Sequence, residues 1–352
     1  MQIGFFPRYS KLGASSRYRF YMYYEKLLEE YPAASLALKP GLSDNYLKKL
    51  YCNGKVSKFC QVKEFLHMYF RALALPENLI IEYELVPQLS YAREQNLIGK
   101  RPYILNFDDN VWEKYRHDPA LADKYDQLCR HAAGIIAAND FLYEKVRLLN
   151  DNVVLIPTVL DLEKYRNNGE EKFADFTLAW IGTPVTYQYL EQHLAELQLM
   201  TADNACTLLI IADKKLEKTR PLANVNAVYA DWSEATENDL LKRCHAGIMP
   251  LTDDEFSRGK SAFKLLQYQA SGLPLLASPV GENKKVVLPG QNGFLCSTPI
   301  QWRDAVELLR SDESLYKQYS KCAQSMAYEY SLQKYFPIFC EFVEKTFKLK
   351  LQ

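Results

Sequence analysis

Most residue patterns that mark a known catalytic centre are missing from this chain of 352 residues. It contains no G-x-G-x-x-G, which leaves a nicotinamide dehydrogenase with little support. Neither G-x-S-x-G nor H-E-x-x-H is present, and the five histidines stand in no motif. These absences weaken the usual hydrolase and metalloenzyme interpretations.

Net charge, cysteine pairs and long apolar runs are missing as well. Basic and acidic residues each total 43, and this balance argues against a general nucleic-acid binder. The eight cysteines form no C-x-x-C pair, and no apolar run approaches the length of a membrane span. The opening MQIGFFPRYS has no signal-peptide pattern. We therefore expect a reduced cytoplasmic protein without a structural metal.

Short apolar runs alternate with segments of helical period along the whole chain, which is too long for one ordinary core. This alternation predicts an α/β protein with parallel sheets covered by helices on both faces. The expected strands are Gln2–Phe6, Ser35–Leu38, Leu79–Glu82, Tyr103–Phe107, Gly134–Ala137, Val153–Ile156, Phe176–Ile181, Thr207–Ile211, Ala227–Tyr229, Ala246–Pro250, Pro274–Ala277 and Gly293–Leu295.

The polar stretch Pro157–Glu171 predicts a linker between two such series. We expect a first domain over residues 1–160, joined by a C-terminal helix at residues 336–352, and a second domain over residues 161–335. Helical periods such as Tyr187–Met200 lie between the strands. Near the end of the chain, Pro337 should kink its helix or begin a new one.

The stretch Gly247–Gly281, GIMPLTDDEFSRGKSAFKLLQYQASGLPLLASPVG, is the most informative. It predicts a strand, a polar loop, a helix entered through Gly259–Ser261, and a second strand. The loop lies at the sheet edge where open α/β sheets bind ligands. Lys260 and Ser261 are expected in the first helical turn, where backbone N–H groups favour an anion.

The same helix carries polar side chains at spacings that share one face. A stripe with two ammonium groups is suited to a bound anion, and a solvated helix edge with snorkelling lysines is the alternative. The stripe consists of Lys260, Lys264, Gln267 and Ser271.

Four segments, in this order, resemble the retaining GT-B glycosyltransferases often called group 1 or family 4. They are Ile156–Thr158 with Asp161 and Leu162; Trp180–Pro184 with Thr186, Tyr189 and Leu190; Gly259–Ser261 with Phe263–Tyr268 and Gly272–Pro274; and Asn292 and Gly293 with Trp302. The first half is similar more loosely, through Ser15–Arg19, which resembles an S-S-x-x-R loop, and Asn106–Trp112, which resembles D-x-D-D-x-x-W.

The resemblance implies a GT-B fold, in which two Rossmann-like domains have parallel sheets facing across an interdomain cleft. The first domain would bind the acceptor and the second the nucleotide-sugar donor. The implied reaction moves a hexosyl unit to a glycan or lipid-linked acceptor with retention and without a metal or other cofactor, as in polysaccharide synthesis. Two alternatives stay open: a non-catalytic nucleotide-sugar-binding partner and a GT-B sugar-nucleotide epimerase.

On this resemblance, Lys264 and Lys260 are the expected catalytic cations, because they would neutralise the departing diphosphate. The family has carboxylates where this chain has Gly259 and Gln267, and an uncharged amide binds ribose more weakly. The other expected donor-binding residues are Gly182, Thr183, Arg258, Ser261 and Trp232. For Arg258 a solvent-facing charge, and for Trp232 an ordinary aromatic between domains, are the alternatives.

Two nearby sets of side chains would serve the acceptor. Asp108 and Asp109 follow a strand, so one of them would orient or deprotonate the acceptor hydroxyl, whereas a helix cap is the alternative. The expected loop Gly13–Arg19 would bring an arginine to phosphate or to an anionic acceptor, and a surface helix start is the alternative. Its candidate residues are Ser15, Ser16, Arg17 and Arg19. The acids Asp253–Glu255 are interpreted as a solvated loop tip and not as a metal cluster.

Residues 45–75 predict a further partner. The segment carries several basic residues but only one acid, Glu64, and aromatic residues are interleaved with the basic ones. Such a surface is suited to an anionic membrane, which would place the protein on the inner membrane face. A helix pair with a buried aromatic face is the alternative. The basic residues are Lys48, Lys49, Lys55, Lys58, Lys63 and Arg71; the aromatic ones are Tyr46, Tyr51, Phe59, Phe65, Tyr69 and Phe70.

Overall fold

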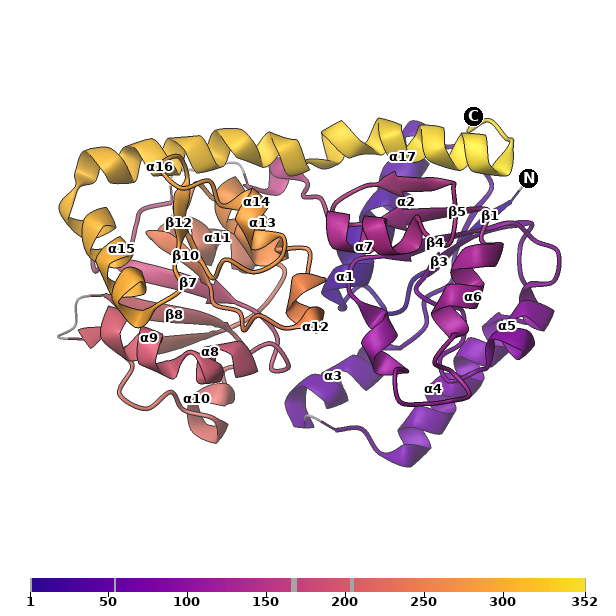
Figure 1. The fold of residues 1–352 in the computed structure, drawn as a ribbon, viewed down its shortest axis with the longest axis horizontal. Helices are drawn as coiled ribbons and strands as arrows, with labels where there is room; N and C mark the ends of the chain where they lie inside the picture. Colours follow the sequence, from indigo (N-terminus) through magenta and orange to yellow (C-terminus); the bar gives the residue numbers. More distant parts are fainter. Residues whose placement is uncertain (1, 54, 166–169, 203–205, 352) are drawn as a thin grey trace. The chain divides into compact units, whose positions relative to one another are not determined.

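The computed structural model describes residues 2–53, 55–165, 170–202 and 206–351. They form two compact units, each with a six-stranded parallel sheet (Figure 1). Unit 1 takes in the chain up to Val159, Gly259–Ser261 and the residues from Leu332 onward. Unit 2 comprises Leu160–Arg258 and Ala262–Ser331. The boundary falls inside the expected linker, of which residues 166–169 lie outside the described residues.

Unit 1 has the strand order β2-β1-β3-β4-β5-β6. The order reverses direction between β1 and β3, so the topological switch point lies between these two strands. Its elements are β1 Ile3–Phe6, α1 Ala14–Ser16, the π-helical turn Arg17–Tyr21, α2 Met22–Glu30, β2 Leu36–Leu38, α3 Asp44–Asn53, α4 Lys58–Arg71, β3 Asn78–Glu82, α5 Tyr91–Ile98, β4 Tyr103–Phe107, the 3-10 turn Val111–Lys114, α6 Lys124–His131, β5 Gly134–Ala137, α7 Asp140–Val146, β6 Val153–Leu155 and α17 Leu332–Phe347.

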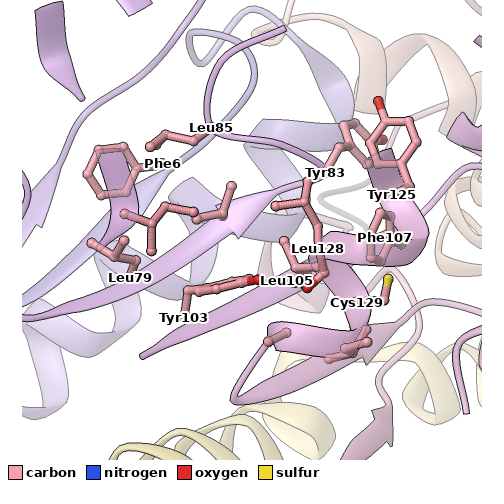
Figure 2. Packing of buried hydrophobic residues seen from close by; sticks show 14 of the residues in the cluster. Phe6, Leu79, Tyr83, Leu85, Tyr103, Leu105, Phe107, Tyr125, Leu128 and Cys129 are labelled. Atoms are coloured by element: carbon pink, nitrogen blue, oxygen red, sulfur yellow. Dashed lines mark hydrogen bonds between the residues drawn. The ribbon is translucent and has the colours of Figure 1, made fainter. Parts of the chain in front are cut away.

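Alternate residues of these strands supply two separate cores, because successive side chains of a strand point to opposite faces. Leu79, Leu105 and Phe107 pack on one face with Tyr125 and Leu128 of α6, as Figure 2 shows. The strands are therefore buried on both sides, which explains their continuous apolar sequences.

The opposite face of the same sheet is covered by α2 and α17 (Figure 1). Ile80 and Ile104 lie there with Phe339 and Val343 of α17, so the last helix completes the core of unit 1. The helix continues through Pro337. A new helix beginning at that proline was therefore a wrong expectation.

Unit 2 has the order β12-β11-β10-β7-β8-β9, the Rossmann arrangement with its switch point between β7 and β10. Its elements are the 3-10 turn Leu162–Tyr165, β7 Thr177–Ile181, α8 Gln188–Gln192, α9 Leu194–Met200, β8 Thr207–Ala212, α10 Leu216–Thr219, β9 Ala227–Asp231, α11 Glu237–Arg243, β10 Ala246–Met249, α12 Glu255–Arg258, α13 Phe263–Ala270, β11 Leu275–Ala277, α14 Asn283–Val286, β12 Gly293–Leu295, α15 Pro299–Ser311, α16 Glu313–Met326 and the 3-10 turn Ala327–Tyr330.

Tyr268 holds α13 against the sheet of unit 2. Its hydroxyl donates to the carbonyl of Ile248 and accepts from the amide of Ile181, each at 3.2 Å, so one side chain bridges β10 and β7. A Cβ atom at Gly247 would lie 2.2 Å from the Tyr268 ring. Only glycine lets the helix approach β10 this closely.

The expected strands and the helical segment expected between β7 and β8 are confirmed in position, whereas the loop expected before α2 was wrong. The segment Tyr187–Met200 is divided into α8 and α9 at His193. The expected loop Gly13–Arg19 is helical from Ala14, because α1, the π turn and α2 follow one another without a break.

Candidate functional site

In each unit, polar or charged residues of the candidate site lie in segments that follow strands at or next to the switch point. In unit 2 these are the segments after β7 and β10, and in unit 1 those after β1, β3 and β4. Open α/β sheets bind ligands at this edge, because the loops there diverge to either side of the sheet.

The turn after β7 contains Gly182 and Thr183, both half-buried. The amide of Thr183 donates to the hydroxyl of Thr186 at 3.1 Å, and this hydroxyl donates to the Thr183 carbonyl at 3.1 Å. A Cβ atom at Gly182 would lie 2.5 Å from the Trp180 ring. The turn therefore needs glycine and presents backbone at the switch point of unit 2.

Lys264 lies beside the same tryptophan. Its Nζ is 5.5 Å from the centroid of the Trp180 ring, and its side chain is half-buried in the first turn of α13. Because Gly182 and Lys264 both lie against Trp180, the structure brings these two predicted residues together at one edge of the sheet. Such an ammonium group, held by a packed helix, is a preorganised partner for an anion.

Lys260 and Ser261 are not in the first turn of this helix, contrary to the sequence-based expectation. The helix begins at Phe263, and its N-cap residue Ala262 has the left-handed backbone conformation with φ 52°. Gly259–Ser261 thus form a separate segment between α12 and α13. The predicted stripe contains only Lys264 and Gln267 within the helix, and Ser271 is its C-cap.

Arg258 ends α12 and forms an ion pair with Asp253, with 2.6 Å between Nε and Oδ1. Both side chains are more than half exposed, so the pair contributes little stability and an incoming anion can compete for the arginine. Asp254 accepts from the amide of Ser257 at 2.7 Å. Among the described residues, no group of three His, Cys, Asp or Glu side chains is placed to hold a metal ion.

The two remaining donor-side candidates have partners inside unit 2. Gln267 is 3% exposed, and its Nε2 lies 3.4 Å from the hydroxyl of Tyr165. Trp232 follows β9 and is half-buried, and its indole N–H donates to Glu237 at 2.5 Å. Their proposed contacts with ribose and base stay predictions.

In unit 1, Asp108 and Asp109 follow β4 as predicted. Asp108 is 6% exposed and accepts a hydrogen bond from the hydroxyl of Tyr83, whereas Asp109 is half-buried. Burial raises the pKa of Asp108, although the charge of Arg19 acts in the opposite direction. The N-cap position of the following turn is occupied by Asn110, so neither aspartate stands at that position.

Glu82, at the end of β3, was not among the site residues predicted from the sequence. It accepts from the hydroxyls of Ser15 and Ser16 and from the amide of Arg8, so it ties the two predicted serines to the sheet. Burial, with the nearby charge of Asp108, raises the pKa of Glu82 to about 7. The sequence signal was available: an acid ends an apolar strand that flanks the switch point.

Two residues further on, Glu84 forms the centre of a buried ion cluster. Its carboxylate lies 2.8 Å from Arg8, 2.7 Å from Lys114 and 2.6 Å from Lys124, and none of its side chain is exposed. Burial alone would raise the pKa of Glu84, but these three cations together lower it below its ordinary range. No spacing in the sequence indicates this cluster.

The structure turns Arg19 into unit 1. Its Nε donates to Asn106 at 2.8 Å and its Nη1 to the carbonyl of Ile156 at 2.7 Å, with 2% of the residue exposed. Its guanidinium therefore holds the first helix against β4 and the end of β6, and a contact of Arg19 with phosphate or acceptor stays a prediction. Arg17 is also largely buried, with its guanidinium over the ring of Tyr18.

A known protein family matches most of unit 2. Residues 175–312 match the family model described as glycosyl transferases group 1. The matched segment contains Gly182, Trp232 and Lys264 and covers less than half of the chain. Unit 2 therefore carries a group 1 glycosyltransferase domain. No curated protein matches the chain.

Several solved structures share the fold over nearly the whole chain. HepE from Anabaena, in complex with UDP-glucose, is 12% identical with a TM-score of 0.73, covering 98% of this chain and all of HepE. Sucrose-phosphate synthase from Thermosynechococcus elongatus is 11% identical with a TM-score of 0.69, covering 99% of each chain. The pneumococcal O-GlcNAc transferase GtfA, with UDP and GlcNAc, is 14% identical with a TM-score of 0.59, covering 81% of this chain and 60% of GtfA. The chain has the GT-B fold.

Proposed function

We propose that the chain is a glycosyltransferase that moves a hexosyl unit from a nucleotide-diphosphate sugar to a glycan or lipid-linked acceptor, with retention and without a metal ion. One observation carries the proposal. The group 1 match falls on the unit in which Gly182 and Lys264 both lie against Trp180 at the Rossmann switch point. Backbone and an ammonium group at this position are suited to a departing diphosphate.

The donor would be bound chiefly by residues of unit 2. Lys264 would neutralise the diphosphate as its bond to the anomeric carbon breaks, assisted by Lys260 and Arg258. The backbone at Gly182 and Thr183 and the segment Gly259–Ser261 would contribute further hydrogen bonds. The Gln267 amide would contact ribose, and Trp232 would stack on the base.

The acceptor would be oriented by unit 1. Asp109 or Asp108 would accept a hydrogen bond from the attacking hydroxyl, and Glu82 would hold Ser15 and Ser16 in place. In the proposed step, the acceptor oxygen forms its bond to the anomeric carbon on the face that the diphosphate leaves. The hydroxyl proton passes to the departing diphosphate or to a carboxylate, and no covalent sugar–enzyme intermediate is required.

UDP is the nucleotide we propose first, because HepE and GtfA are each seen with UDP or a UDP-sugar. The test is a thermal-shift series with UDP, GDP, ADP and dTDP, followed by product analysis with UDP-glucose and UDP-GlcNAc. We expect UDP to raise Tm. We also expect an α-linked product from an α-linked donor, formed equally in EDTA. A β-linked product, or turnover abolished by EDTA, would contradict this mechanism.

A non-catalytic nucleotide-sugar-binding protein is the second candidate, and one observation favours it. Gln267 stands where the family has a carboxylate, is buried, and lies within hydrogen-bonding distance of Tyr165. Calorimetry with UDP-sugars, combined with mass analysis across acceptors, separates the two. Tight binding without transfer or donor hydrolysis would favour the binding protein.

A further inference from the structure

Helix α4 exposes a row of large apolar side chains. Phe59 is 83% exposed, Val62 56%, Leu66 44% and Phe70 62%, and Leu73, just beyond the helix, is 57% exposed. Single exposed apolar residues are ordinary on a protein surface, but a contiguous row marks a surface that binds something.

The four residues within the helix share one face. At 3.6 residues per turn, Phe59, Val62, Leu66 and Phe70 fall within an arc of about 80°. The opposite face of α4 is the one that packs on unit 1, through the buried residues Cys60, Glu64 and Met68. Figure 1 shows α4 on the side of unit 1 away from α17.

Within residues 45–75 the exposed charges are all basic, whereas Asp44, at the start of α3, is an exposed acid just outside this segment. Five exposed lysines lie on or near α4, at positions 48, 49, 55, 58 and 63. The single acid of the segment, Glu64, is buried and accepts from the amide and hydroxyl of Ser43. Arg71, expected on the same surface, is instead turned inward and donates to the carbonyls of Lys39 and Leu85. Gly54 of this segment lies outside the described residues.

We propose that α4 docks unit 1 on an anionic lipid surface, with the apolar row in the acyl boundary and the lysines among the headgroups. Lysine is depleted in protein–protein interfaces, whereas a lysine-flanked apolar face is characteristic of helices that lie in the membrane interface. No helix of the described residues is long and apolar enough to cross a membrane, and the proposal requires only a helix that lies on it. It does not depend on the catalytic function, since lipid binding needs no donor.

The test is sedimentation of the full chain with vesicles of phosphatidylcholine alone and of phosphatidylcholine with phosphatidylglycerol. We expect binding only to the anionic vesicles. The triple variant Phe59→Ser, Leu66→Ser and Phe70→Ser should lower the partition coefficient at least a hundredfold. The matched control Leu148→Ser, 80% exposed elsewhere in unit 1, should bind as the wild type does.

A second pair of variants separates charge from apolar contact. Lys58→Gln with Lys63→Gln should lower binding roughly thirtyfold, because each lysine near the surface contributes about a fivefold step. Lys100→Gln with Lys345→Gln, two exposed lysines elsewhere in unit 1, should leave binding unchanged. Circular dichroism establishes that each variant is folded.

Three results would overturn the proposal. The first is equal binding of wild type to neutral and anionic vesicles, and the second is normal vesicle binding by the folded triple variant. The third is a concentration-dependent dimer, abolished in the triple variant, in a protein that binds no vesicle; it would assign the row to a second copy of the chain. Sedimentation measures no turnover, so each of these results leaves the proposed function standing.

Discussion

The two units share one architecture and differ at the carboxyl edges of their sheets. Unit 1 buries charge at this edge, with Glu82, Glu84 and Asp108 each at most 6% exposed. Unit 2 presents mostly backbone at its switch point, together with the half-buried Lys264. The same strand geometry therefore supports two different electrostatic environments.

The difference corresponds to two kinds of ligand. A buried carboxylate fixed by hydrogen bonds keeps its position, which is useful for orienting a neutral hydroxyl. Backbone and a lysine near solvent are better suited to a dianion that must arrive and depart, because desolvating them costs less.

Glu84→Gln should affect stability most. The variant takes the shared carboxylate from Arg8, Lys114 and Lys124, and the completely buried Lys124 keeps only its ion pair with Glu94. We expect the free energy of unfolding to fall by about 3–5 kcal/mol in urea titrations. Glu341→Gln, an exposed acid on α17, should change it by less than about 0.5 kcal/mol. An unchanged urea midpoint for Glu84→Gln would mean that the cluster does not stabilise unit 1.

Lys264→Ala should act on turnover with little effect on folding. Loss of the ammonium group beside Trp180 should lower kcat by about 10²–10³-fold, because the leaving diphosphate loses a preorganised partner. Lys321→Ala, an exposed lysine on α16, is the control in steady-state assays. A near-normal kcat in Lys264→Ala would remove the residue from the proposed mechanism.

Gly247→Ala should disturb the packing that positions Lys264. The added Cβ atom meets the Tyr268 ring, and we expect a cost of about 1–3 kcal/mol in thermal unfolding. In a Tyr268→Leu background the ring is absent, so the same substitution should cost less. An equal cost in both backgrounds would show that the contact with the ring is not the cause.

Glu82→Gln should change the pH dependence of stability in unit 1. The pKa of Glu82 is about 7 in the fold and 4.5 ordinarily, so the native state binds the proton more tightly. Its stabilising contribution is present at low pH and is lost as pH rises from about 5 to 7. We expect the variant to flatten this decline by on the order of 1–2 kcal/mol, measured by urea unfolding at a series of pH values. An identical slope in wild type and variant would exclude the shift.

The strands could be predicted from sequence because their physical cause is local. Tyr103–Phe107 and Gly293–Leu295 were expected with both ends correct, since each is a short apolar run bounded by polar or turn residues. The order of the strands was not predicted. The order depends on which runs pair in three dimensions. The order in turn determines where each sheet has its switch point, beside which Gly182 and Glu82 lie.

The site was predicted in part for the same reason. Lys264 could be predicted on the helix because it lies in a motif and fits the helical period. Lys260 was wrongly expected in the first helical turn, because nothing in the sequence marks Ala262 as left-handed. Glu84 could not be assigned a role, since its strongest partner, Lys124, lies forty residues further along the chain. Burial and pairing of charge across such separations are properties of the folded chain.

The helix α17 has a consequence for how the protein is made. Phe339 and Val343 cover Ile80 and Ile104 of the first sheet, although the entire second unit is translated between them. The ribosome therefore supplies all of unit 2 before the face of the earlier sheet can be closed. During synthesis, that uncovered apolar face is where we expect chaperones to bind and truncated chains to aggregate.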